Sequence, residues 1–194
     1  MDGHGGAPPV VRRDPPCGYA HGMRPIAAEL AATLGLEPHP EGGFFRETYR
    51  AAETVATPRG ERATSTAILF LLTPSSPSRF HRLLSDELWV FQGGRPLELV
   101  TLGVDGDARR RRLGAPGASG AAPQALVPAG AWQAARVAVS EADDAVVTST
   151  DERAWSLVTC VVTPGFDFAD FELGRRDELT RLCSGQAELI AALT

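Results

Sequence analysis

Apolar residues in this chain come in short runs, with a turn signal about every 8–12 residues. The strongest runs cover residues 65–73, 96–102, 132–139 and 155–163. The run over 65–73, STAILFLLT, is almost continuously apolar, which is typical of a strand buried on both faces. Because no long helical patterns separate these strands, the sequence predicts an all-β sandwich or barrel rather than a parallel α/β sheet.

Weaker patterns fill the intervals between the strong strands. Residues 44–49 mix aromatic and charged positions and predict a strand, whereas residues 51–63 are polar and predict a loop. A short strand is expected over 124–127. Residues 164–172 are rich in Phe and predict a further strand directly after the run that ends at 163.

Helical patterns occur only near the two ends of the chain. Residues 25–36 predict a helix, with Pro25 suited to the first turn and Gly35 to the stop. The residues from Arg175 onward predict one or two short amphipathic helices. Residues 1–23 are rich in Gly and Pro and predict a disordered tail, with Met23 as a candidate true start. We therefore expect one domain over 24–185, followed by a helical tail over 186–194.

The net charge argues against a nucleic-acid partner, and the lack of a long apolar segment argues against a membrane span. The formal net charge is −5, whereas nucleic-acid-binding proteins generally carry a basic surface. The basic run Arg109–Arg112 follows a hairpin turn signal at 104–107 and is expected to form a solvated hairpin rather than a phosphate site. No window approaches the roughly 18 apolar residues of a membrane span, and the N-terminal region lacks the apolar core of a secretory signal. The expected location is the cytoplasm.

The three cysteines, Cys17, Cys160 and Cys183, are odd in number and lack the spacing of a metal site. No disulfide framework is expected. Cys160 falls in an apolar strand pattern, which predicts a small core residue.

One stretch concentrates polar chemistry inside an apolar pattern. Residues 78–94, SRFHRLLSDELWVFQGG, place His81, Asp86 and Glu87 among aromatic residues on two strand-like runs, and the second run ends at paired glycines. Side chains of one strand face alternate sides of a sheet, so part of this set is expected to face a barrel interior. The stretch predicts the wall of a pocket.

Several sequence blocks, in order, resemble one known family. They are PHPEGG at 38–43, STAI at 65–68, FHR at 80–82 with SDELW at 85–89, GRPLEL at 94–99, VPAGAWQ at 127–133 and PGFDFADF at 164–171. Together the blocks resemble the cupin superfamily, and within it the small bacterial and fungal cupins grouped as DUF985, which are related to sugar-nucleotide epimerases. The resemblance implies an all-β jelly-roll barrel (a double-stranded β-helix) with short flanking helices. It also implies a homodimer with a small-molecule ligand in the barrel.

The resemblance also bears on metal binding. Metal-binding cupins place two histidines two residues apart, a glutamate four residues later and a last histidine on a later strand. His81 and Glu87 match this pattern, but Leu83 and Gln133 stand where the other two histidines belong. Related sequences also often carry histidines where this chain has Val90 and Val100. No cofactor is therefore expected; the alternative is a divalent metal held by His81, Glu87 and Gln133.

Without a metal, His81 and Glu87 would form an acid–base pair able to move a proton at a carbon next to a carbonyl. Tyr49 is a candidate proton donor, by similarity to the related epimerases, and Arg46 a candidate clamp for a carboxylate or phosphate. On a flat strand these two cannot both face inward. The remaining candidate substrate contacts are Ser65, Phe80, Trp89, Phe91, Trp132 and Gln133.

Other polar residues have a structural interpretation. Arg82 and Asp86 alternate away from His81, which predicts a surface or dimer salt bridge. His39, between two prolines, is expected to hold its turn. Asp167 and Asp170 are expected to cap backbone groups at a strand end.

Three functions remain open on the sequence alone. The first is a metal-independent isomerase, epimerase or cyclase that acts on a small polar metabolite or biosynthetic intermediate. The second is a cupin that binds a small molecule without catalysis. The third is a metal-dependent oxygenase or isomerase with an incomplete ligand set.

Overall fold

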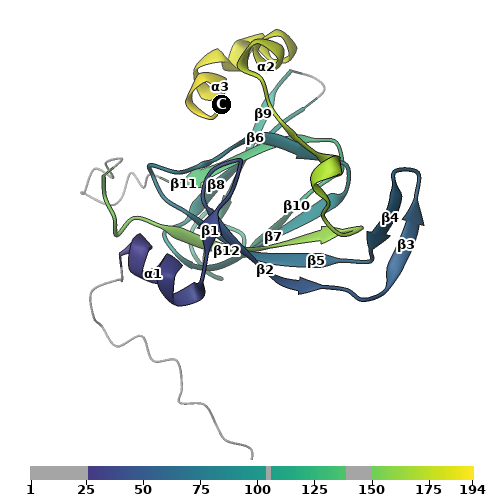
Figure 1. The fold of residues 1–194 in the computed structure, drawn as a ribbon. Coiled ribbons are helices and arrows are strands. Elements are labelled where there is room, and N and C mark those ends of the chain that lie inside the picture. Colours follow the sequence, from purple (N-terminus) through teal and green to yellow (C-terminus); the bar gives the residue numbers. More distant parts are fainter. Residues whose placement is uncertain (1–25, 104–105, 139–149) are drawn as a thin grey trace, which may run out of the picture.

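The strands pair into two facing antiparallel sheets, as expected for a jelly-roll barrel (Figure 1). The structure is a computed structural model that describes residues 26–103, 106–138 and 150–194. The first sheet has six strands in the order β1 (Glu37–Pro38), β2 (Phe44–Arg50), β5 (Thr66–Leu72), β12 (Ser156–Thr163), β7 (Asp86–Gly94) and β10 (Gln124–Val127). The second has five, in the order β13 (Phe171–Leu173), β6 (Ser78–Leu83), β11 (Trp132–Val137), β8 (Leu97–Leu102) and β9 (Ala108–Leu113).

The apolar runs predicted from the sequence form interior strands of these sheets. Strand β5 lies between β2 and β12, and β12 lies between β5 and β7, so both are hydrogen-bonded along both edges. The core between the sheets is built around fully buried side chains from both of them, including Phe70, Trp89, Leu97, Leu99 and Leu113. The predicted all-β class is confirmed.

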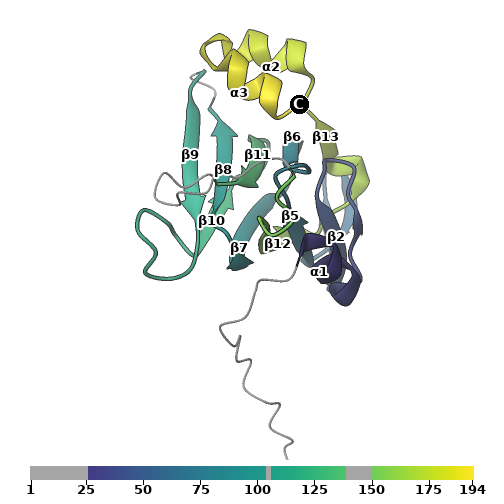
Figure 2. The same ribbon diagram turned by 90° about the vertical axis from the view of Figure 1, so that its left-hand side faces the viewer.

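Helices cover parts of the outer faces of the two sheets (Figure 2). Helix α1 (Ala27–Leu34) ends at Gly35, whose φ of 62° is readily adopted by glycine; the helix predicted over 25–36 is confirmed, although Pro25 lies outside the described residues. Helices α2 (Arg176–Leu182) and α3 (Ala187–Ala192), joined by the 3-10 turn η2 (Ser184–Gln186), pack on the outer face of the five-stranded sheet. The side chains that form this contact are Phe80, Val100, Trp132, Leu179, Leu189 and Ile190.

Two segments differ from the sequence expectation. The predicted loop over 51–63 contains a hairpin of β3 (Thr54–Thr57) and β4 (Gly60–Ala63), which projects at one end of the six-stranded sheet. Its strands are short and exposed, so they carry no apolar alternation to reveal them. The predicted Phe-rich strand over 164–172 begins with a cis Thr163–Pro164 bond and continues into the 3-10 turn η1 (Phe168–Asp170) before β13. There the Asp167 side chain accepts the Ala169 amide and caps the turn.

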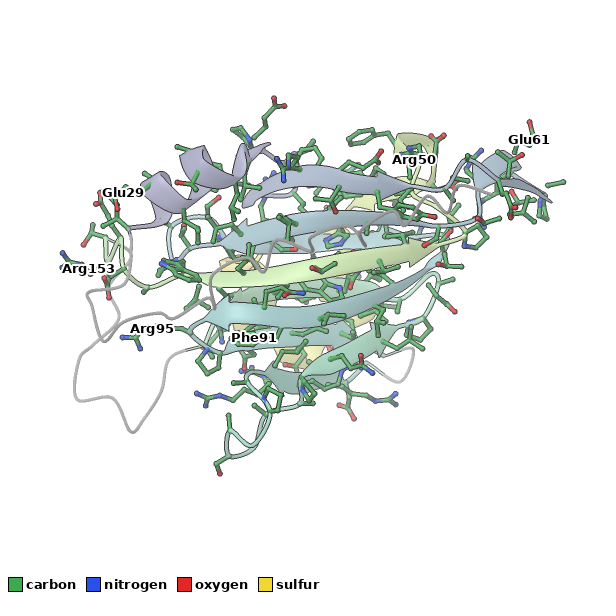
Figure 3. The ribbon with its side chains drawn as sticks, turned by 90° about the horizontal axis from the view of Figure 1, so that it is seen from below. Glu29, Arg50, Glu61, Phe91, Arg95 and Arg153 are labelled. Carbon is green, nitrogen blue, oxygen red and sulfur yellow. The ribbon has the colours of Figure 1, made fainter. Side chains whose placement is uncertain are left out.

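Figure 3 looks onto the six-stranded sheet from its outer side, with Glu29 and Arg153 at one end and Arg50 and Glu61 at the other. The basic run lies on β9, which pairs with β8, so the expected hairpin is confirmed. None of the helices in the described ranges is both long and apolar enough to cross a membrane.

Candidate functional site

A cavity of about 350 Å³ opens between the two sheets. Strands β2, β5, β6, β7 and β12 supply its walls, and the turn before β2 and the segment around η1 complete them. The lining residues are His39, Glu41, Phe45, Glu47, Arg50, Thr66, Ile68, Phe70, His81, Leu83, Glu87, Cys160, Val162, Phe166, Asp167 and Phe168.

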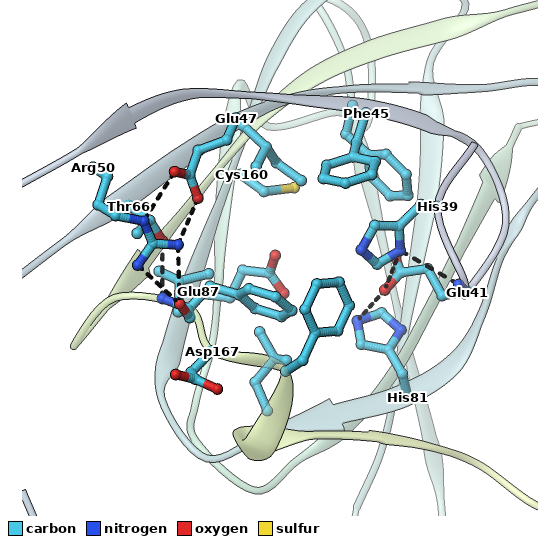
Figure 4. A pocket seen from close by; sticks show the side chains of 16 residues that line it. His39, Glu41, Phe45, Glu47, Arg50, Thr66, His81, Glu87, Cys160 and Asp167 are labelled. Carbon is cyan, nitrogen blue, oxygen red and sulfur yellow. Dashed lines mark hydrogen bonds and ion pairs between the residues drawn. The ribbon is translucent and has the colours of Figure 1, made fainter. Parts of the chain in front are cut away.

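The turn before β2 brings two polar side chains to the cavity (Figure 4). The His39 amide donates to the Gly43 carbonyl at 3.1 Å, and the Gly42 amide donates to the His39 carbonyl at 3.0 Å. At Gly42, φ is 109° and a Cβ would lie 2.0 Å from the Pro77 carbonyl oxygen, so only glycine fits this turn. The closed turn leaves His39 and Glu41 side by side against the barrel interior.

Glu41 is the centre of a buried polar cluster. Its side chain is only 7% exposed, and Ser78 Oγ donates to Oε1 at 2.8 Å. Oε2 lies 3.4 Å from His39 Nδ1 and 3.4 Å from His81 Nε2. Burial raises the pKa of Glu41 to about 8, although the Ser78 hydrogen bond and the charge of Arg79 oppose the shift. The carboxyl group is therefore protonated at neutral pH.

Hydrogen bonds fix where the two histidines carry their protons. His81 Nδ1 lies 2.8 Å from the Arg79 carbonyl, which can only accept, so Nδ1 carries the proton and Nε2 the lone pair. The Glu41 amide donates to His39 Nδ1 at 3.3 Å, so that nitrogen also carries a lone pair. Burial lowers the pKa of His39 to about 4 and also lowers the pKa of His81. The lone pair of His81 Nε2 is thus directed at the protonated Glu41 carboxyl, whereas the lone pair of His39 Nδ1 already accepts from the Glu41 amide.

A second buried carboxyl, that of Glu87, lies close to the first. Gln133 Nε2 donates to Glu87 Oε2 at 2.5 Å, and Gln133 Oε1 accepts from Trp89 Nε1 at 3.0 Å. Burial raises the pKa of Glu87, and the charge of Glu41 acts in the same direction. Burial likewise raises the pKa of the Cys160 thiol well above its usual value, so the thiol stays protonated and is not a nucleophile.

An ion pair lies on the opposite side of the cavity (Figure 4). Arg50 Nε and Nη2 donate to the Glu47 carboxylate at 2.9 and 2.7 Å, and the guanidinium also donates to the Phe166 carbonyl at 3.3 Å. The Phe166 amide donates to Thr66 Oγ1 at 2.9 Å, which ties the segment before η1 to β5. Asp167 completes this polar rim.

The structure brings together part of the site expected from the sequence. His81 and Glu87 line the cavity, and Gln133 lies directly behind Glu87. Tyr49 is 56% exposed on β2, after a register shift between Glu47 and Tyr49, and does not line the cavity. Arg46 is also exposed and lies near Gly35 of the α1 C-cap.

The expected aromatic contacts lie elsewhere. Phe80 and Trp132 point to the outer face, beneath α2 and α3, because they alternate with the inward-facing His81 and Gln133. Trp89 and Phe91 pack in the barrel core, and Trp89 reaches Glu87 only through Gln133. Ser65 donates to the Val162 carbonyl at 3.3 Å and is not among the lining residues.

Other sequence interpretations have mixed outcomes. Arg82 forms a surface ion pair with Glu172 at 2.7 Å and lies 4.7 Å from the centre of the Trp132 ring, whereas Asp86 accepts the Ala129 amide at 2.8 Å instead of joining an ion pair. The expectation that Asp170 caps backbone groups was wrong, because its side chain is paired with arginines of the β3–β4 hairpin. Cys160 is buried as expected, and Cys183 is buried as well.

Sequence reasoning missed His39 and Glu41 as site residues, and also the rim residues Glu47 and Arg50. The signal for the first two was present in PHPEGG, where two prolines and two glycines impose a rigid turn around a histidine and a glutamate. The expectation that His39 holds the turn is correct for its backbone, but its imidazole faces the cavity. Nothing in the sequence distinguishes Glu47 and Arg50 from other charged residues on a half-exposed strand.

The donor set does not suit the metal of the metal-binding cupins. Leu83 lines the cavity in place of one histidine. Gln133, in place of another, already uses its amide oxygen for Trp89 and its amide nitrogen for Glu87. Within the described ranges, no three His, Cys, Asp or Glu side chains form a group that could hold a metal ion.

Comparisons with known proteins agree with this fold. The model of a family described as Cupin superfamily (DUF985) matches residues 28–174. An uncharacterized protein of Saccharomyces cerevisiae is 32% identical over 160 residues, which are 76% of this chain and 75% of the yeast protein. The solved structure of a hypothetical protein from Leishmania major aligns with a TM-score of 0.77 and 36% identity, over 88% of this chain and 99% of that chain. The crystal structure of a Shewanella oneidensis protein aligns with a TM-score of 0.74 and 32% identity, over 88% and 98% of the two chains. The chain belongs to the DUF985 family of the cupin superfamily.

Proposed function

We propose that this cupin is a metal-independent isomerase, epimerase or cyclase that moves a proton at a carbon next to a carbonyl group of a small polar metabolite. The observation that carries the proposal is the position of the Glu41 carboxyl between the ring nitrogens His39 Nδ1 and His81 Nε2, in one cavity with Glu87. Groups of this kind, buried and with shifted pKa values, are typical of sites that perform acid–base chemistry.

The two carboxyl groups support different roles in such a step. A carboxyl that stays protonated at neutral pH can donate its proton to a carbonyl oxygen as the carbon–hydrogen bond breaks. Glu87 in its ionised form would take the carbon-bound proton, and the electrons of that bond form the double bond of an enol. Return of the proton from Glu87 to the neighbouring carbon, with Glu41 taking back a proton from the hydroxyl oxygen that becomes the new carbonyl, completes an isomerisation. An epimerisation needs instead a proton from a donor on the opposite face of the enol, with Glu41 taking back the proton of the enol oxygen.

His81 would relay protons to and from Glu41. Its Nε2 lone pair faces Glu41 Oε2 at 3.4 Å, so this ring can take up or return the proton of the carboxyl; His39 Nδ1 lies equally close, but its lone pair is engaged by the Glu41 amide. Their contacts with the Glu41 amide and the Arg79 carbonyl hold the rings in one orientation. The volume of about 350 Å³ lies at the small end of the range for small-molecule sites.

Hydrogen–deuterium exchange on carbon tests the proposal before a full reaction is known. Small carbonyl compounds are incubated with the protein in D₂O, and loss of the α-proton signal is followed by proton NMR. We expect exchange of at least one compound, reduced about 100-fold or more in Glu41→Gln and in His81→Gln. Glu37→Gln is the matched control, because Glu37 is exposed on β1 outside the cavity.

Two results would contradict proton transfer at this site. One is exchange that persists unchanged in Glu41→Gln. The other is a compound that binds wild type and variants alike while no turnover or exchange is found, which would favour a binding protein without catalysis. The homodimer implied by the resemblance stays a prediction, and light scattering of the purified protein tests it.

A further inference from the structure

The cavity is unevenly charged. Four carboxyl groups line it, those of Glu41, Glu47, Glu87 and Asp167, whereas Arg50 is the one arginine among the described lining residues. The two histidines do not add positive charge at neutral pH, because burial lowers the pKa of each. Because Glu41 is protonated at neutral pH and Glu47 is paired with Arg50, the uncompensated negative charge of the lining comes from Asp167 at the rim and from Glu87 in its ionised form.

The single arginine is not available to an anion. Arg50 makes two hydrogen bonds to the Glu47 carboxylate and donates to the Phe166 carbonyl. An anionic ligand at Arg50 would therefore meet a charge already balanced by Glu47, next to the carboxyl group of Asp167 on the same rim. Like charges brought together in this way are strongly disfavoured.

Aromatic rings accompany the carboxyl groups. Phe45, Phe70, Phe166 and Phe168 line the cavity, and Phe168 remains 57% exposed although it is a large apolar side chain. Phe166 and Phe168 meet edge to face with ring centres 5.0 Å apart. Aromatic faces next to carboxylates are the common means of binding an ammonium group, since both present negative potential to it.

We infer that the ligand of this cavity carries an ammonium group, which lies at the rim formed by Glu47, Asp167 and Phe168. The inference rests on the proposed function, because it names the class of substrate for the same site. The ammonium end would face the rim, and the end that bears the carbonyl would face Glu41 and Glu87. Carboxylates, phosphates and nucleotide sugars would be poor ligands.

Three probes of similar shape that differ in the charge of the end group test the charge preference directly. They are choline, its uncharged isostere with a tert-butyl group in place of the trimethylammonium group, and the matching carboxylate. Binding is measured by calorimetry and by chemical shifts of cavity residues at low and high salt. We expect choline to bind about ten-fold tighter than the isostere, the carboxylate to be the weakest of the three, and the choline preference to shrink at high salt.

Charge-neutralising variants place the effect at the rim. Asp167→Asn keeps the side-chain oxygen that accepts the Ala169 amide, so the turn should stay intact. It should weaken choline about three-fold and leave the isostere unchanged. Glu47→Gln should weaken choline further, because it also frees Arg50. Asp177→Asn, an exposed acid on α2, is the matched control and should have no effect.

Several outcomes would overturn the inference. These are equal binding of choline and its isostere, tighter binding of the carboxylate, no binding of choline at tens of millimolar, or equal effects of Asp167→Asn and Asp177→Asn. None of these outcomes depends on the result of the hydrogen–deuterium exchange experiment with Glu41→Gln. A failure of the ligand class is therefore distinguishable from a failure of the proposed reaction.

Discussion

Arg62 and Asp170 lie 108 residues apart in the chain, and their side chains meet in a two-bond ion pair, with Nε and Nη2 donating to the two carboxylate oxygens at 2.8 and 3.0 Å. Arg59 approaches the same carboxylate at 3.2 Å. The carboxylate is 6% exposed. This contact ties the β3–β4 hairpin to η1, the turn that carries Phe168 to the rim of the cavity.

Replacing Asp170 with Asn should destabilise the fold by about 2 kcal/mol, because two arginines lose a buried partner. The Arg62 hydrogen bonds, and then the nearby charges, lower the pKa of Asp170. An acid with a lowered folded pKa stabilises the protein above its unfolded pKa. The difference in unfolding free energy between wild type and variant should therefore reach its maximum above about pH 4 and decrease below it. Urea unfolding at several pH values checks this, and a pH-independent difference would show that packing and not charge is responsible.

The paired glycines at the end of β7 should differ sharply in their tolerance of a side chain. At Gly94, φ is 91°, and a Cβ would lie 2.2 Å from the Trp155 carbonyl oxygen and 2.4 Å from its ring. At Gly93 nothing lies within 4 Å of the same position. Gly94→Ala should cost at least about 2 kcal/mol of unfolding free energy, whereas Gly93→Ala should be close to neutral. Thermal unfolding of the two variants makes the comparison, and equal effects would contradict it.

Stability should fall as the pH rises from about 6.5 to 8. Glu41 has a raised folded pKa of about 8, so in this window the folded state holds a proton that the unfolded state has released. The stabilisation is present below the unfolded pKa and is lost as the pH approaches 8. The lowered pKa of His39, about 4, acts in the opposite sense but only below its unfolded value of about 6.5. Between pH 6.5 and 8 the unfolding free energy should fall by about 1–2 kcal/mol.

Glu41→Gln should remove most of this decline, and Glu37→Gln should keep it. Guanidinium unfolding at pH 6.5 and 8 measures both. Glu87 also has a raised pKa and contributes in the same direction, so a small decline should remain in Glu41→Gln. A wild-type protein equally stable at the two pH values would contradict the protonated state of Glu41.

Chelation should leave the proposed proton transfer unchanged. Leu83 and the doubly engaged Gln133 replace the ligands of a metal-binding cupin. Metal content by plasma mass spectrometry and the exchange rate, each measured before and after EDTA, test this. The double variant Leu83→His/Gln133→His serves as the positive control and should gain affinity for Co²⁺, visible in its absorption spectrum. Stoichiometric metal in wild type that is lost in His81→Ala would instead support a metal enzyme.

The parts of the fold that follow from local patterns were predictable. The strand over 65–73 was recognisable because its residues are apolar on both faces, and β5 is indeed paired on both edges. The end of α1 at Gly35 was recognisable because a positive φ favours glycine. The β3–β4 hairpin was missed because exposed short strands need no apolar alternation. The course of 164–172 was misjudged because its phenylalanines serve the rim of a cavity and not the alternation of a strand.

Strand alternation, turn residues and short motifs act over a few neighbours, so the barrel, its terminal helices and the family could be predicted from the sequence. The stretch predicted as a pocket wall also holds His81 and Glu87, which line the cavity from consecutive strands of opposite sheets. Three contacts of the site are visible only in the folded protein: Glu41 lies between His39 and His81, Gln133 is hydrogen-bonded at both ends of its amide, and Arg50 is paired with Glu47. Protonation states depend on burial and on partners from distant strands, and folding alone brings these together.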